Sequence, residues 1–291
     1  MIQRLFIGML IFALVFFCTF INGCNKSPEK KPPQSAQNQE SAQKPKEPKE
    51  LKDITKDIES ILKEEQKKQE IKEKPNQSEE QNKSGHESAQ TQSGEGEKQQ
   101  GQQKEAKQDS QKSGMQDWTK EEKAVQSIHQ KWNLLETFAV KAGAEDSLIM
   151  EFETNLDSLT NQVMEKNIME TQKSANKLYG SAIKIDELFQ TDNPPQADMM
   201  KYFTKESLLA IEEDNWLDAE RNVQNLKKQW EKVKTMLDKE GAQLSTQMDY
   251  AIHDFDQSIT KRNKYVAMIK GEIVSSNIEK IIEEIKKEKD Q

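Results

Sequence analysis

The chain has 291 residues, of which 51 are acidic and 43 are basic, giving a formal net charge of −8. No stretch of basic residues interleaves with aromatic residues, so the features typical of nucleic-acid binding are absent. The sequence also lacks a Gly-rich phosphate loop, a Gly-x-Ser-x-Gly elbow and a His-Glu-x-x-His motif. These absences disfavour most enzyme classes, and we expect no enzymatic activity and no nucleic-acid partner.

The N-terminus has the organisation of an export signal. Arg4 supplies positive charge, residues 5–20 are almost wholly apolar, and the chain becomes polar from Asn25. An apolar run of about 16 residues is shorter than the ~20 that a membrane-spanning helix needs. The sequence therefore predicts a signal peptide over residues 1–23. An ordinary secretory signal, or an uncleaved membrane anchor, is the alternative.

Four residues at the end of the apolar run, Ile21, Asn22, Gly23 and Cys24, resemble the lipobox of bacterial lipoproteins. Ile21, Gly23 and Cys24 match that pattern, whereas Asn22 departs from its usual small residue. The resemblance implies that Cys24 carries a diacylglycerol and fatty acyl chains, with the protein anchored on the extracytoplasmic side of the cell membrane. Two or three acyl chains suffice for stable anchoring, since each buried methylene contributes about 0.8 kcal/mol.

Cysteine usage restricts what stabilises the rest of the chain. Both cysteines, Cys18 and Cys24, lie within this N-terminal segment. The remaining residues therefore hold no disulfide and no thiolate metal site.

Residues 24–116 differ sharply in composition from the C-terminal part. Beyond Cys24 this segment has no aromatic residue and no valine, and it is dominated by Lys, Glu, Gln, Ser and Pro. Such a segment buries too little apolar surface to offset the entropy of ordering it. We therefore expect a disordered linker that carries the folded part away from the membrane.

One stretch of this linker has apolar residues at helical spacing, between Pro48 and Pro75. They are Leu51, Ile54, Ile58, Ile61 and Leu62. A transient or partner-induced helix is one interpretation. We favour local helicity in solvent, because an isolated helix of this length is marginal in water.

Residues 117–291 contain all four tryptophans and all four tyrosines, and they form the predicted folded domain. Apolar residues recur there every three or four positions, as at Val125, Ile128 and Trp132, and no segment alternates apolar with polar residues. The sequence predicts an all-α fold, an antiparallel bundle of about five to seven amphipathic helices. Thr119 and Glu122 have capping-box spacing, so we expect Thr119 to cap the first helix.

The segment from Glu212 to Trp230 resembles uncharacterised helical domains of membrane-tethered proteins of Gram-positive bacteria. In those domains a turn ending in Asp-x-Trp leads into a helix with Ala, Leu and Trp on one face, as in Asp214-Asn215-Trp216 here. The resemblance implies a helical architecture and an envelope location, but no chemistry.

Asp249, His253 and Asp256 form the best candidate for a metal site. A helix places residues at i, i+4 and i+7 on one side, and their oxygen and nitrogen ligands suit zinc, iron or manganese. In the alternative interpretation these three lie in solvent, while Met248, Ile252 and Phe255 form the buried face. We favour the alternative, because no second ligand cluster accompanies the three residues.

Two functional hypotheses follow. In the first, which we favour, a non-enzymatic surface lipoprotein presents a helical module to an envelope protein, a cell-wall component or a small ligand. In the second, a helical-bundle lipoprotein binds a metal or small ligand through Asp249, His253 and Asp256, for uptake. Both place the protein at the membrane through its lipid anchor.

Overall fold

The computed structural model describes residues 44–73 and 117–289. Within these ranges the protein is all-α and has no strand, which confirms the predicted fold class. The predicted signal peptide, the lipobox residues Ile21, Asn22, Gly23 and Cys24, and most of the predicted linker lie outside the described residues. Nowhere in 44–73 or 117–289 is a helix both long enough and apolar enough to cross a bilayer.

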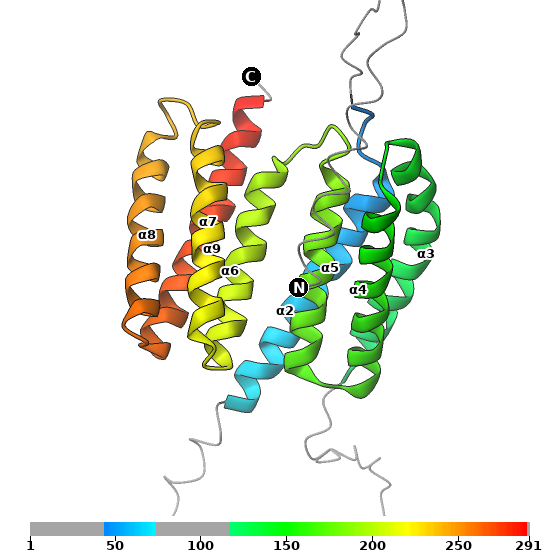
Figure 1. Cartoon of the computed structure of the whole chain (residues 1–291), viewed down its shortest axis with the longest axis horizontal. Helices are drawn as coiled ribbons and strands as arrows, with labels where there is room; N and C mark the ends of the chain where they lie inside the picture. Colours follow the sequence, from blue (N-terminus) through cyan, green and yellow to red (C-terminus); the bar gives the residue numbers. More distant parts are fainter. Residues whose placement is uncertain (1–43, 74–116, 290–291) are drawn as a thin grey trace, which may run out of the picture. The chain divides into compact units, whose positions relative to one another are not determined.

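Eight helices are present in the described ranges, slightly more than the five to seven expected. They are α2 (Lys49–Glu73), α3 (Thr119–Lys141), α4 (Asp146–Glu165), α5 (Ile168–Asp186), α6 (Pro195–Glu212), α7 (Trp216–Lys234), α8 (Ala242–Thr260) and α9 (Lys264–Lys289). Figure 1 shows their arrangement.

Two separate clusters of buried apolar side chains divide the helices into two sets of four. The first cluster is built from α2 to α5 and the second from α6 to α9. Within each set every helix packs against the next along the chain, and the last helix packs against the first. Each set is therefore a four-helix bundle in up-down-up-down order. We call them the first and second bundles.

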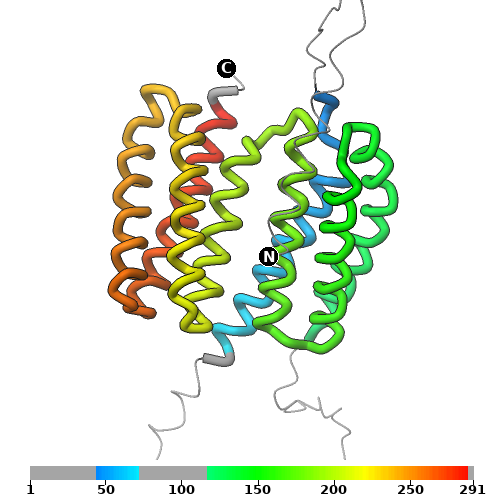
Figure 2. The backbone as a smooth tube through the Cα atoms, in the orientation of Figure 1, coloured from blue at the N-terminus to red at the C-terminus, as the bar shows by residue number. Residues whose placement is uncertain are grey.

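The α5–α6 pair joins the two bundles, and Figure 2 follows the backbone through the connection between them. The two helices run antiparallel: Tyr179 near the end of α5 hydrogen-bonds Asp198 near the start of α6. A Cβ atom on Gly180 would lie 2.8 Å from Cε2 of Tyr202. Glycine at this position therefore allows the Tyr202 ring to rest against α5, where it packs on the core of the first bundle.

The position of α2 corrects the predicted linker. Leu51, Ile54, Ile58 and Ile61 are each at most 1% exposed, and α2 packs against α3 and α5 as a full member of the first bundle. The expectation of a solvated helix is therefore wrong. Composition misled because the apolar face of α2 is covered by α3 and α5, which lie far along the chain. The folded part begins well before residue 117.

A buried ion cluster fixes α2 to the start of α3. Lys68 Nζ lies 2.7 Å from Glu65 Oε1 and 2.8 Å from Glu121 Oε1, and it sits 3.6 Å above the centroid of the Trp118 ring. All four side chains are buried. Trp118, not Thr119, is the N-cap residue of α3, and it makes no side-chain cap. The expected capping box is therefore absent, and Glu121 instead serves as a partner of Lys68.

Two carboxylates share one lysine in this cluster, and burial shifts the titration of Glu65. Burial, and the neighbouring charge of Glu121, raise the pKa of Glu65 to about 7, against the opposing effect of Lys68. A carboxyl whose pKa is raised on folding stabilises the protein least where it is ionised. The contribution of Glu65 to the free energy of unfolding therefore falls as the pH rises from 4.5, the ordinary pKa of a glutamate, towards 7.

The burial of α2 predicts contrasting effects for two isoleucines of that helix. Ile58→Ala removes a fully buried side chain and should lower the free energy of unfolding by about 2–5 kcal/mol. Ile71 is 72% exposed, so Ile71→Ala should change it by less than about 0.5 kcal/mol. Urea unfolding followed by tryptophan fluorescence measures both values. Equal small effects would show that α2 contributes nothing to the core.

The ion cluster predicts a pH-dependent effect for Glu65→Gln. The variant keeps the side-chain volume but cannot ionise, so it should gain on the order of 1–3 kcal/mol over the parent at about pH 8 and little at about pH 5. Its neighbour Glu64 is the control, because hydrogen bonds from Lys67 and Lys120 lower the pKa of Glu64 to about 2. Glu64→Gln should therefore not stabilise the protein at either pH, as melting temperatures would show.

Candidate functional site

The residues of the predicted metal site are occupied in contacts between α7 and α8. Asp249 accepts hydrogen bonds from Trp230 Nε1 at 2.7 Å and from Lys234 Nζ at 2.6 Å. Asp256 pairs with Lys227 at 2.8 Å, and His253 is exposed. In the part of the chain that the structure describes, no three His, Cys, Asp or Glu side chains form a group that could hold a metal ion. The structure therefore does not bring these residues together.

The structure agrees with one part of the alternative interpretation, the buried face of α8, whereas Asp256 is half-buried. Met248, Ile252 and Phe255 are at most 3% exposed and form the buried face of α8. The two aspartates then act as pairing groups for lysines of α7 at the edge of the second bundle.

A polar cleft of about 540 Å³ lies where α2, α5, α6 and α9 meet, and it is the best candidate for a functional site. We call it the inter-bundle cleft. Its charged lining consists of six carboxylates and four lysines: Glu47, Glu59, Asp186, Asp192, Asp198 and Glu279, with Lys52, Lys56, Lys201 and Lys286. Its volume is in the range of small-molecule sites.

Lys201 of α6 connects the walls of the cleft. Its Nζ lies 2.9 Å from a Glu279 oxygen on α9 and 3.5 Å from a Glu59 oxygen on α2. It is also 3.7 Å from Asp198 on its own helix. Although burial alone would lower the pKa of Lys201, these carboxylates raise it above its ordinary value. Lys201 therefore stays charged, and its ammonium group contacts carboxylates of both bundles.

Tyr179, Asp198 and Asn193 form a hydrogen-bonded group at the base of α6. The Tyr179 hydroxyl donates to Asp198 Oδ1 at 3.2 Å, and Asn193 Nδ2 donates to Asp198 Oδ2 at 3.4 Å. Burial raises the pKa of both Tyr179 and Asp198. Asp198 lies in the first turn of α6, where the helix dipole favours a negative charge. Its position is therefore explained by the fold.

The helix dipole and hydrogen bonds that explain the position of Asp198 do not explain the position of Asp186. It is the last residue of α5, where the helix dipole disfavours a negative charge. Its Oδ1 atom is buried and has no hydrogen-bond donor among the described residues. Burial, together with the charges of Glu47 and Asp198, raises the pKa of Asp186 to about 8. A carboxyl kept under these conditions costs stability, which is typical of functional positions.

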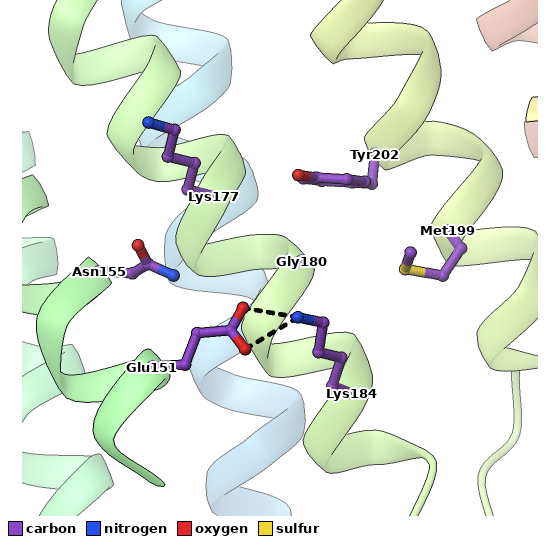
Figure 3. Close-up of a pocket in the computed structure, with 7 residues that line it drawn as sticks. All are labelled: Glu151, Asn155, Lys177, Gly180, Lys184, Met199 and Tyr202. Carbon is purple, nitrogen blue, oxygen red and sulfur yellow. Dashed lines mark hydrogen bonds and ion pairs between the residues drawn. The ribbon is translucent and has the colours of Figure 1, made fainter. Parts of the chain in front are cut away.

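A second, smaller pocket of about 300 Å³ lies between α4, α5 and α6 (Figure 3). Glu151 and Lys184 form a two-armed ion pair across it at 2.6 and 2.8 Å. The ring of Tyr202 extends from α6 towards α5. Among the described residues, none of the side chains lining this pocket contains a buried polar atom without a hydrogen bond. No buried polar atom of this lining calls for a partner from a ligand, and we assign the pocket a structural role.

Comparisons with protein-family models, with curated proteins and with solved structures found no match for this chain. The assignment of a site therefore depends on geometry alone. Sequence reasoning missed every residue of the inter-bundle cleft, since its members come from α2, the α5 end, the 187–194 connection and α9. The available signal was Asp186 itself, an acidic residue at the end of a predicted helix.

Asp186→Asn is expected to stabilise the protein at high pH. The pKa of Asp186 is raised on folding, so its contribution is lost as pH rises from about 4 towards 8, whereas asparagine does not titrate. The gain should be on the order of 1–3 kcal/mol at about pH 8.5 and near zero below about pH 4. Thermal melts of the variant and of Asp157→Asn, an exposed carboxylate on α4, test this. A destabilising effect of Asp186→Asn would show that the carboxylate has a structural partner.

Proposed function

We propose that this chain is a non-enzymatic, lipid-anchored binding protein on the extracytoplasmic side of the cell membrane, and that the inter-bundle cleft is its ligand site. One observation carries the proposal: two buried acceptor atoms, Asp186 Oδ1 and Asn193 Oδ1, lie in the lining of one cleft without donors among the described residues. Buried acceptors are normally paired. A bound ligand supplies the missing donors.

The preferred role is binding rather than catalysis. The sequence offers none of the catalytic motifs that bring a nucleophile and a base together. The cleft instead combines paired lysines and carboxylates with apolar side chains such as Ile183 and Ile282. Such a lining, in which a few polar groups orient a ligand against an apolar floor, is typical of small-molecule sites.

The anchor is supported by Ile21, Gly23 and Cys24, which match the lipobox pattern. Residues 25–48 separate Cys24 from the start of α2 at Lys49. A chain of that length spans at most about 80 Å. With α2 inside the first bundle, the proposed cleft therefore stays near the membrane instead of at the end of the longer linker that the sequence predicts.

Replacement of either cysteine tests the anchor. Cys24→Ala should abolish metabolic labelling by fatty acid and release the protein from the membrane fraction, since the thioether has no other acceptor in this pattern. Cys18→Ala is the matched control and should leave labelling and fractionation unchanged. Unchanged labelling of Cys24→Ala would reject Cys24 as the lipid acceptor.

A further inference from the structure

The two acceptor atoms without donors differ from the other polar atoms of the inter-bundle cleft. Asn193 Nδ2 is engaged with Asp198, so the amide oxygen is the atom left without a donor. Asp186 Oδ1 is the second. The two residues lie at either end of the connection that follows α5, and both line the cleft. Each of the two residues therefore contributes to the cleft lining an acceptor atom that has no donor among the described residues.

Three of the donors that line the cleft are engaged with other groups. Lys201 contacts carboxylates of α2 and α9, as described above. Lys52 Nζ lies 2.6 Å from Asp192 and 3.3 Å from Glu47. The Tyr179 hydroxyl donates to Asp198. The missing partner of the two acceptors is therefore a donor brought from outside the described residues.

The charge and shape of the lining narrow the chemical class of that donor. Six carboxylates face four lysines, so an anion is disfavoured. A metal ion is also disfavoured, because one carboxylate and one amide oxygen fall short of three ligands, and no such group exists within 44–73 and 117–289. A cation with hydrogen-bond donors and an alkyl group fits this lining. Its donors match the two acceptors, and its alkyl group matches the apolar side chains of Ile183 and Ile282.

We propose that the inter-bundle cleft binds a small organic ammonium compound, whose nitrogen donates hydrogen bonds to Asp186 Oδ1 and Asn193 Oδ1. This inference rests on the proposed binding function and names the ligand class of the same site. The attached carbon chain lies along Ile183 and Ile282. An ammonium group has three donors and no acceptor, so it satisfies both oxygens and retains one donor for water.

Binding is coupled to the ionisation of Asp186. The charged groups that act on its carboxyl are Glu47, which precedes α2, Lys52 of α2, Asp198 of α6 and the adjacent Glu187. The pKa of Asp186 is about 8 without a ligand, so most of the carboxyl is protonated at neutral pH. An ammonium ion favours the ionised form. Ligand binding therefore releases a proton, and affinity rises with pH.

The experiment is isothermal titration calorimetry of the full-length chain in detergent, with n-butylammonium and 1,4-diaminobutane as probes. We expect saturable binding with one site per chain, and an affinity at least about tenfold higher at pH 8.5 than at pH 6. Titrations in two buffers of different ionisation enthalpy should show proton release. The uncharged probe 1-butanol and the anion butyrate should bind at least about tenfold more weakly.

Variants assign the binding to the two acceptors. Asp186→Asn should weaken the butylammonium affinity by at least about tenfold and remove its pH dependence, and Asn193→Ala should weaken it roughly threefold to tenfold. Asp157→Asn should leave it unchanged. Because Asp186→Asn is expected to be more stable than the parent, a melt of the same sample separates lost binding from lost folding.

Three results would overturn the inference. Equal affinity for 1-butanol would show an apolar site, and binding of Zn²⁺ that Asp186→Asn abolishes, without amine binding, would show a metal site. Absence of saturation by either amine up to about 10 mM would exclude the class. None of these affects labelling at Cys24, so the anchored binding protein can be tested apart from its ligand.

Discussion

The packing of α2 against α3 and α5 is the contact on which the structure depends. Four aliphatic side chains on one face of α2, from Leu51 to Ile61, are at most 1% exposed. Without them α3, α4 and α5 would leave their shared core open on one side. The same helix supplies one wall of the inter-bundle cleft through Lys52, Lys56 and Glu59. The fold and the candidate site therefore share one element.

The charges of the molecule are arranged in two contrasting ways. Between α7 and α8, Asp249 and Asp256 each pair with a lysine near the surface, and such pairs contribute little to stability. In the inter-bundle cleft, Lys201 is shared among three carboxylates, while Asp186 Oδ1 has no hydrogen-bond donor among the described residues. The first arrangement follows from solubility and helix packing. The charges of the inter-bundle cleft lower the stability of the ligand-free protein and favour a bound cation.

Periodicity carried the fold prediction further than composition did. Apolar spacing correctly indicated helices throughout 117–289 and also marked Leu51, Ile54 and Ile58, whose helix the structure confirms. Composition then led to the wrong environment for that helix, because its core partners lie 70 to 130 residues away in sequence. Local patterns report which face of a helix is apolar, but they do not report which helices cover it.

The candidate site was less predictable for a related reason. Asp249, His253 and Asp256 share a helix face, which sequence spacing reveals, yet their partners come from α7, which spacing does not reveal. The residues of the cleft do not share a helix face. Asp186 and Asn193 flank the connection after α5, while Lys201 and Glu279 lie on α6 and α9, the first and last helices of the second bundle along the chain. Only tertiary packing brings such residues together.

The place of α2 in the first bundle also alters what proteolysis would do to this protein. Residues 74–116 begin and end on the same folded unit, because α2 precedes them and α3 follows them. A protease that cuts there severs the backbone between Cys24 and most of the helices. The buried isoleucines and the Lys68 cluster would still hold the two fragments together. If Cys24 carries the proposed lipid anchor, release of the helical part would require a cut before α2.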